Sequence, residues 1–252
     1  MPRGIDALYT DFIFKETGHL ATWLPTKLIR VGDVGALKGA LLAPEFRVDL
    51  DGPERLGNVL DRLEISTPDS VEVNVKASGE SPTEYRALAK DDAGVSVVFR
   101  RRGAVLAQFG DYCESSIEDV RAARRKLASL LTSGDAEPGS LLVTSVFSAM
   151  HLSVMIANRP MARMEFRSPR GLGDHSRPSG LPGLFGDLEP VHRSGMATVI
   201  IGATGQTPLF AGVRHRANGG GIEQIVLGDR GTTAVTGILD HEDPRFEYVG
   251  LR

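Results

Sequence analysis

The sequence predicts an α+β fold in which helices flank a central, twisted, mostly antiparallel β-sheet. Three observations predict this class. Apolar residues alternate with polar ones at a period of two in several stretches, which is typical of half-buried strands. The 29 glycines and 14 prolines supply many turns, and one segment alone carries a strongly amphipathic helical pattern. A chain of 252 residues can bury a sizeable core, and we expect one domain over 1–252.

Composition and charge indicate a globular intracellular protein. Hydrophobic residues make up 41% of the chain and charged residues 24%, and the net charge of −3 argues against a general nucleic-acid binder. Cys113 is the only cysteine, so an intrachain disulfide is impossible and a reducing compartment is favoured. The N-terminal sequence lacks the apolar core of a secretory signal, and we therefore expect a cytoplasmic protein.

The first half of the chain is expected to contain strands and one weak helix. The helical pattern is faint and covers 52–65. From 71 to 76 valines alternate with polar residues, and from 94 to 110 two short strands surround a turn at 100–103. The apolar positions of these strands are Val71, Val73, Val75, Val95, Val97 and Phe99.

The strongest helical pattern covers 115–134. Ser115 and Glu118 have the spacing of a capping box, and Gly134 is placed to end the helix. One stripe of the helix is apolar and is expected to face the core: Ile117, Val120, Leu127, Leu130 and Leu131. Outside this stripe, on the side expected to be exposed, lie four basic residues: Arg121, Arg124, Arg125 and Lys126.

An uncharged stretch from 141 to 157 contains neither proline nor glycine. It is shorter than the roughly 20 apolar residues of a membrane-spanning helix, and its β-branched residues favour a strand over a buried helix. After a turn signal at 158–160, the period of two returns from 162 to 167. The segment is therefore a strand pair or one long bent strand, with apolar positions at Val146, Leu152, Val154, Ile156, Met164 and Phe166.

Further strands are expected at 196–205, 207–216, 222–228 and 232–240, after a loop rich in proline and glycine at 169–195.

No element carries a recognisable catalytic or metal-binding motif. The nucleophile elbow G-x-S-x-G is absent, the segment 202–207 lacks the ending of a phosphate-binding loop, and the histidines are scattered singly. We therefore expect no cofactor, no metal and no enzymatic activity.

Basic residues gather on two of the expected elements. Arg100, Arg101 and Arg102 occupy the expected hairpin tip, and between 100 and 126 seven basic residues stand against four acidic ones. Such groups often serve solubility alone. The functional interpretation is an anionic partner, because each Lys or Arg near an acidic bilayer contributes about 1 kcal/mol of binding free energy. No aromatic residues interleave with the arginines, so acidic phospholipid is favoured over nucleic acid.

The order of elements resembles that of a known family. Long alternating strands lie on both sides of an amphipathic basic helix, and they follow the segment ATWLPTKLIRVGDVGALKGALLAPEFRVDL at 21–50. This layout resembles the pore-forming domain of the gasdermin family, and within it the short fungal regulator-of-cell-death proteins. The resemblance covers nearly the whole chain and rests on layout rather than on a short fingerprint.

The resemblance implies a protein that binds acidic phospholipid through its basic residues at 100–102 and 121–126 and forms a homo-oligomer. Two β-hairpins per subunit, from roughly 70–110 and 141–228, would insert to form a pore that kills the cell. The protein would thus be cytoplasmic when inactive and at the cell membrane when active. The resemblance also implies a trigger in the form of a variant homologous partner protein, and no C-terminal inhibitory domain.

Two other functions stay open from the residues alone. One is a hydrolase-like enzyme on an α+β scaffold, whose site is assembled from scattered residues. The other is a β-rich domain that only binds a protein partner.

Overall fold

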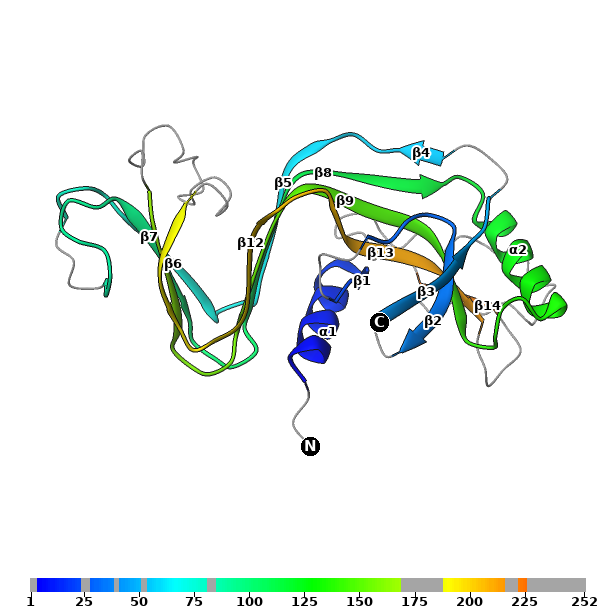
Figure 1. Ribbon diagram of the computed structural model, residues 1–252, viewed down its shortest axis with the longest axis horizontal. Coiled ribbons are helices and arrows are strands. Elements are labelled where there is room, and N and C mark those ends of the chain that lie inside the picture. The colour runs from blue at the N-terminus through cyan, green and yellow to red at the C-terminus, as the bar shows by residue number, and fades with distance from the viewer. Residues whose placement is uncertain are drawn as a thin grey trace. The chain divides into compact units, whose positions relative to one another are not determined.

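The computed structural model describes residues 4–23, 28–38, 41–50, 54–80, 85–168, 188–215 and 222–225. Its fold class is the predicted one, α+β, with two helices and large, mostly antiparallel β-sheets (Figure 1). Several expectations lie wholly or partly outside the described residues, among them most of the loop at 169–195, the end of the strand at 222–228, and the strand at 232–240. The last part of the expected loop is wrong, because Glu189–Ser194 form the strand β11.

The described residues contain two helices and fourteen strands. The helices are α1 (Ile5–Thr17) and α2 (Val120–Ser133). The strands are β1 (Leu20–Ala21), β2 (Asp33–Lys38), β3 (Leu41–Arg47), β4 (Glu54–Leu56), β5 (Leu60–Ser66), β6 (Val71–Lys76), β7 (Gly94–Phe99), β8 (Val105–Ile117), β9 (Ser140–Ala157), β10 (Ala162–Arg167), β11 (Glu189–Ser194), β12 (Met196–Ala203), β13 (Gln206–His215) and β14 (Ile222–Ile225). They form one sheet of ten strands and one of four.

These residues divide into two compact units. The first unit consists of Leu60–Tyr112 and Ala149–Gly205, together with the beginning of α1. The second unit consists of the described residues outside these ranges. The strands β8 and β9 are continuous from one unit into the other.

The first unit is a four-stranded ribbon that is folded over on itself. In the larger sheet its strands lie in the order β5-β8-β9-β12, and in the four-stranded sheet the order is β6-β7-β10-β11. The chain passes between the layers at 67–70, 100–104, 158–161 and 195, so each strand continues into the strand at the same place in the other layer (Figure 1). The unit therefore consists of two long hairpins, β5 to β8 and β9 to β12, whose four arms each bend once.

The four turns between the layers lie side by side. The amide of Arg100 donates to the carbonyl of Ser70 (2.8 Å), and the amide of Asn158 donates to the carbonyl of Gly195 (2.9 Å). Each turn contains one residue in the left-handed backbone conformation, which glycine adopts readily and residues with a side chain do not. These residues are Asp69 (φ 53°), Gly103 (φ 74°), Met161 (φ 58°) and Gly195 (φ 69°).

The apolar core of the first unit lies between the two layers. On the four-stranded sheet three cross-strand rows occupy the inner face: Val71–Phe99–Ala162, Val73–Val97–Met164 and Val75–Val95–Phe166. On the larger sheet Leu106 and Met155 belong to the same core. Burying one large apolar side chain contributes about 1.5–3 kcal/mol, so these rows are a major source of the stability of the unit.

The prediction that 94–110 forms a hairpin is wrong, because β7 and β8 do not pair with each other. Although the pattern predicts a tip at 100–103, β7 pairs with β6 and β10, whereas β8 pairs with β4, β5 and β9. The turn instead carries the chain from one layer to the other. Alternation of apolar residues reveals a strand but not its partner. The stretch 140–167, by contrast, is one long strand bent at 158–161, which is one of the two alternatives left open by the sequence.

In the second unit a β-sheet packs against α2. Its strands lie in the order β1-β13-β9-β2-β3, with β14 beside β13. Gly35 lies at a register shift between β2 and β3, where a Cβ atom would collide with the carbonyl oxygen of Ala43. The core shared by the helix and the sheet consists of Val34, Ala123, Leu127, Leu130, Ala136, Leu142 and Val213.

The helix α2 begins later than the sequence predicts, because β8 continues to Ile117. Its N-cap is Asp119, whose side chain accepts a hydrogen bond from the amide of Ala122 at 3.0 Å. The capping box expected at Ser115 is therefore wrong. Gly134 ends the helix in the left-handed conformation (φ 81°), as predicted.

The helix expected at 52–65 is also wrong. This segment contains β4 and β5, and each of them pairs with a part of β8. Pairing with a long neighbouring strand outweighs the weak helical propensity of the segment.

His19 gives the second unit a buried histidine. The residue is 7% exposed, its Nδ1 donates to the carbonyl of Thr17 (3.1 Å), and its ring packs edge-on against Phe147, with 4.4 Å between the centroids. Burial lowers the pKa of His19 from 6.5 to about 4. The folded protein therefore keeps this ring neutral at pH values at which the unfolded chain would protonate it.

We predict that the protein loses stability as the pH falls from 6.5 to about 4, the two pKa values of His19. In this window the unfolded chain binds a proton that the folded chain does not, so the free energy of unfolding should fall by up to about 3 kcal/mol. Above this window His19 is neutral in both the folded and the unfolded chain, so it causes no loss of stability there. The His19→Phe variant should lose less stability than the unchanged protein between about pH 7 and about pH 4.5. Urea denaturation at both pH values checks this, and equal losses would contradict it.

Candidate functional site

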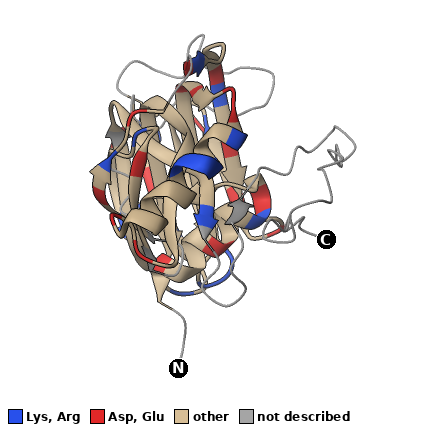
Figure 2. Cartoon of the chain, turned by 90° about the vertical axis from the view of Figure 1, so that its right-hand side faces the viewer, with Lys and Arg blue, Asp and Glu red and all other residues tan. Residues whose placement is uncertain are grey.

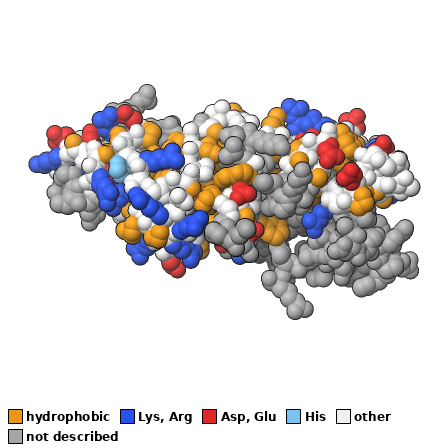
Figure 3. All heavy atoms as spheres, turned by 60° about the horizontal axis from the view of Figure 1, so that its bottom comes forward, with side chains coloured by type: hydrophobic (Ala, Val, Ile, Leu, Met, Phe, Trp, Pro, Cys, Tyr) orange, Lys and Arg blue, Asp and Glu red, His pale blue; other side chains and the backbone are white. Residues whose placement is uncertain are grey.

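The four turns of the first unit form a basic surface, which we call the corner surface: residues 67–70, 100–104, 158–161 and 195. Four of its residues are exposed arginines: Arg100, Arg101, Arg102 and Arg159. Its one acidic residue is Asp69. Figure 3 brings the lower side of Figure 1 forward and shows Lys and Arg side chains gathered at the left, over the first unit. The corner surface is thus positive in a chain whose net charge is −3.

An apolar side chain lies among these arginines, since Met161 is 65% exposed. Arg159 donates from Nη2 to Oγ of Ser194 (3.1 Å), and Arg100 forms an ion pair with Glu72, with 2.9 Å between Nη2 and Oε2. Both arginines are exposed, so these contacts orient them without removing them from solvent. Arginines beside an exposed apolar group suit an acidic bilayer surface, which offers phosphate charge and an apolar boundary.

The second group of basic residues lies on α2, in the second unit (Figure 2). Arg121, Arg125 and Lys126 are exposed, as expected. Arg124 is only 7% exposed, so its expected place on the exposed side of the helix is wrong. The reason is its spacing, because a residue three positions before the buried Leu127 lies on the same face of a helix.

Most of the apolar residues predicted to enter a membrane share one face of the four-stranded sheet. They are Val71, Val73, Val75, Val95, Val97, Phe99, Met164 and Phe166. In β9 the residues that belong to the core between the layers are Met155 and Ala157. The other β9 positions predicted for the first unit alternate with these two and lie on the opposite face: Leu152, Val154 and Ile156. Val146 belongs to the second unit.

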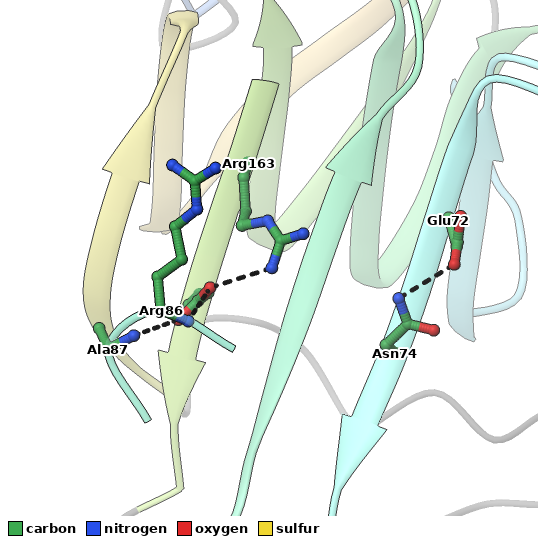
Figure 4. A network of polar contacts seen from close by, with 6 residues as sticks. Glu72, Asn74, Arg86, Ala87 and Arg163 are labelled. Carbon is green, nitrogen blue, oxygen red and sulfur yellow. Dashed lines mark hydrogen bonds and ion pairs between the residues drawn. The ribbon is translucent and has the colours of Figure 1, made fainter. Parts of the chain in front are cut away.

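The segment 85–92, which we call the returning segment, folds back onto the outer face of the four-stranded sheet. Glu165 of β10 is fully buried, and its carboxylate accepts hydrogen bonds from the amides of Arg86 (2.9 Å) and Ala87 (2.8 Å) (Figure 4). Arg163 lies beside the same carboxylate, with 3.4 Å between Nη1 and Oε1. A buried charge is tolerated only when it is paired or hydrogen-bonded, so these contacts bind the segment to the sheet.

A second buried charge holds the far end of the returning segment. Lys76, the last residue of β6, is fully buried, and its Nζ donates to the carbonyls of Lys90 (2.9 Å) and Asp92 (2.6 Å). Between the two anchors Leu88 is 3% exposed and packs so closely on Gly94 that a Cβ there would lie 2.7 Å from Cδ1 of the leucine. The connection between β6 and β7 is therefore attached at both ends.

Sequence reasoning does not single out four residues that matter in this region: Lys76, Arg159, Met161 and Glu165. The signal for Arg159 is its place next to Pro160 in an expected turn, which indicates an exposed position. Lys76 and Glu165 carry no such signal, because both look like the polar positions of ordinary alternating strands. Their burial depends on the returning segment, which has no periodicity of its own.

The chemistry that the described residues offer is anion binding. Groups of arginines lie on the corner surface, on α2 and on the outer face of the four-stranded sheet, and single arginines lie on other strands. No group of three or more His, Cys, Asp or Glu side chains among them could hold a metal ion. Neither of the described helices has the length and apolar character needed to span a membrane.

We predict that the Glu165→Gln substitution loosens the returning segment. The neutral amide accepts weaker hydrogen bonds than the carboxylate and adds donors in the same buried space, so the free energy of unfolding should fall by about 1.5–3 kcal/mol. Hydrogen exchange at the amides of Arg86 and Ala87 should become faster.

The matched control for this variant is Glu189→Gln. Glu189 is exposed and pairs with Arg167 at 2.7 Å, so its loss should change stability by less than about 1 kcal/mol. Chemical denaturation and amide hydrogen exchange measure both effects. Exchange rates at Arg86 and Ala87 that are the same in the two variants would contradict the role given to Glu165.

Comparison with known proteins gives no family for this chain. Neither a family model, nor a curated protein, nor a solved structure matches it. Its function is therefore inferred from the residues and geometry of the two units.

Proposed function

We propose that the protein is a pore former of gasdermin type, which binds acidic phospholipid and inserts the two hairpins of the first unit into the membrane. The observation that supports this proposal is the folded ribbon, whose arms keep the same order in both layers. Straightening the four turns would convert the two layers into a single longer sheet without exchanging any strand partner. The backbone hydrogen bonds, which lipid cannot replace, would be kept.

The arms of the ribbon are long enough for this role. A strand that crosses a membrane needs about 9–11 residues. Within the first unit the arm made of β7 and β8 runs from Gly94 to Tyr112, and the arm made of β9 and β10 runs from Ala149 to Arg167. The hairpins proposed to insert are those of Leu60–Tyr112 and Ala149–Gly205, which replace the spans of 70–110 and 141–228 implied by the resemblance.

In the four-stranded sheet the two faces have the polarity that such strands require. In the larger sheet both faces of β9 are apolar, because Leu152, Val154 and Ile156 lie on the face away from the shared core. The face in the core between the layers is apolar and would turn to the lipid. The outer face of the four-stranded sheet carries Glu72, Arg163 and Glu165 and would line the pore. In the folded ribbon the apolar face is covered by the other layer, so neither state would expose it to water.

The turns also determine which positions of each arm lie on its apolar face, before the turn and after it. Phe99 and Ala104 belong to the same core although an odd number of positions separates them, and the same is true of Ala157 and Ala162. In a regular strand such positions would lie on opposite faces. A straightened arm would therefore keep one extra residue at the turn, as in a β-bulge, and Gly103 already has the left-handed conformation of that residue.

The edges of the ribbon support a homo-oligomer. Among the described residues β6 and β11 are the outer strands of the four-stranded sheet. The β11 edge of one copy could pair with the β6 edge of the next. Such a head-to-tail contact repeats from copy to copy, and it closes into a ring when the rotation between neighbouring copies divides a full turn. Assembly would move the protein from the cytoplasm to the cell membrane and cause cell death. The proposed trigger is a variant homologous partner protein.

Acidic phospholipid is the proposed first contact. The corner surface would bind it through Arg100, Arg101 and Arg102, which are exposed on neighbouring positions of one turn. On α2 the exposed Arg121, Arg125 and Lys126 would form a second contact with the lipid. Arg124 would not take part in this contact, because it is buried. Binding of this kind weakens as salt is added, because screening shortens the reach of the charges to about 10 Å at 0.1 M ionic strength.

Leakage from dye-filled vesicles tests this proposal. The protein should release dye from vesicles that contain phosphatidylserine and not from vesicles of phosphatidylcholine alone. Replacing Arg100, Arg101 and Arg102 with Ala should weaken vesicle binding roughly 100-fold, since each contributes about 1 kcal/mol. Replacing the same three residues with Lys keeps their charge and should preserve binding. If acidic vesicles stay sealed, with or without homologous variants of the protein, the proposal is wrong.

Val75 offers a position where insertion can be hindered without damage to the folded ribbon. It lies on the apolar face of β6 opposite Val95 and is 40% exposed, whereas Val154 and Ile156 are fully buried. The Val75→Lys variant should keep its Tm within a few degrees and leak more slowly, because a Lys on the lipid face costs up to about 2–4 kcal/mol. The isosteric control is Val75→Thr. Thermal melting and leakage rates check this, and equal rates in the two variants would count against insertion of β6.

A further inference from the structure

A hollow of about 430 Å³ lies on the outer face of the four-stranded sheet, beside the returning segment. Its walls come from β6, β7, β10, the corner surface and the returning segment, all within the first unit. The lining combines two arginines with an amide, a phenol and two apolar side chains: Arg86, Arg163, Asn74, Tyr85, Val98 and Met161. A volume of this size suits a small molecule or a headgroup.

The two arginines of the hollow are positioned by one buried carboxylate. Glu165 accepts from the backbone amide of Arg86 (2.9 Å) and contacts Nη1 of Arg163 (3.4 Å). Figure 4 shows both arginine side chains over the outer face at β10. Arg86 belongs to the returning segment and Arg163 to the sheet, so they come together only while the segment is folded back.

One acidic residue, Glu72, also lines the hollow. Its carboxylate accepts hydrogen bonds from Arg100 (2.9 Å) and from Asn74 (3.2 Å), and these bonds lower the pKa of Glu72. The charge of Glu72 is therefore balanced by Arg100. In and around the hollow there are three arginines, Arg86, Arg100 and Arg163. They exceed the two carboxylates, Glu72 and Glu165, so the net charge of the hollow and its immediate surroundings is positive.

We propose that this hollow binds a phosphomonoester, held between the guanidinium groups of Arg86 and Arg163. A guanidinium presents a planar fork of N–H donors that matches the oxygens of a phosphate. Asn74 and Tyr85 carry neutral donors, and Val98 with Met161 offers an apolar surface to the group that bears the phosphate. The same chemistry fits a free phosphorylated small molecule or the headgroup of a phosphomonoester lipid.

A ligand in this hollow would connect the returning segment to the sheet. Its contacts to Arg86 and Arg163 exist together only in the folded ribbon, and a ligand that binds one conformation stabilises it by mass action. A free phosphomonoester would therefore oppose insertion of the hairpins. This last consequence rests on the proposed pore function, whereas binding of the phosphate does not.

Binding is tested in solution, without membranes, with phenyl phosphate as the probe and phenol as its uncharged control. Phenyl phosphate should raise the Tm and bind saturably in a calorimetric titration, and phenol should do neither. Arg86→Gln should weaken binding about tenfold or more, and it should fold normally because this side chain is exposed. Arg167→Gln removes an arginine of β10 that does not line the hollow and should bind as the unchanged protein does.

Vesicles that contain phosphatidic acid, whose headgroup is a phosphomonoester, distinguish the two sources of phosphate. Weaker vesicle binding by Arg86→Gln than by Arg167→Gln identifies the headgroup as a ligand. Equal vesicle binding together with phenyl phosphate binding that depends on Arg86 identifies a free molecule. The proposal is overturned if the two variants bind both phenyl phosphate and vesicles equally. Binding of phenyl phosphate that depends on Arg86, in a protein that never releases dye, would remove the pore function and leave this site.

Discussion

The contact between the two layers of the first unit is the interaction on which the rest of this unit depends. Each layer presents an apolar face to the other layer, and straight arms would expose that face to water along their whole length. Bending every arm once brings the two faces together and closes a core that includes the fully buried Phe99, Met155 and Phe166. The bend also collects the four turns along one side, where side chains need not be apolar, and there the arginines of the corner surface lie.

The outer face of the four-stranded sheet is stabilised in a different way. Lys76 and Glu165 are both fully buried, and both hold the backbone of the returning segment rather than each other. A buried charge that loses its partners costs several kcal/mol, so neither anchor can open alone without penalty. Release of the segment is therefore expected to be cooperative, and a ligand between Arg86 and Arg163 would add to the same set of contacts.

Much of this fold can be predicted from the sequence, because alternation reports that one face of a strand is buried. The valines of β6 and the charged and apolar residues of β10 are found in this way, and Gly134 marks the end of α2. Alternation does not report partners, which is why the turn at 100–104 is mistaken for a hairpin tip. Local propensity fails at 52–65 for the same reason, since pairing with β8 decides its structure. The site is predicted only where its residues are exposed: the arginines of the turn can be found, whereas Glu165 and Arg124 look solvated and are buried.

The backbone of the four turns has a mechanical consequence. Gly103 and Gly195 adopt their left-handed conformation without penalty, but Asp69 (φ 53°) and Met161 (φ 58°) do so with side chains. Such a residue raises the energy of the bent chain by about 1 kcal/mol. Asp69 lies in the first hairpin and Met161 in the second, so each hairpin contains one strained joint. Each joint would release that energy only if extension took its residue out of the left-handed conformation.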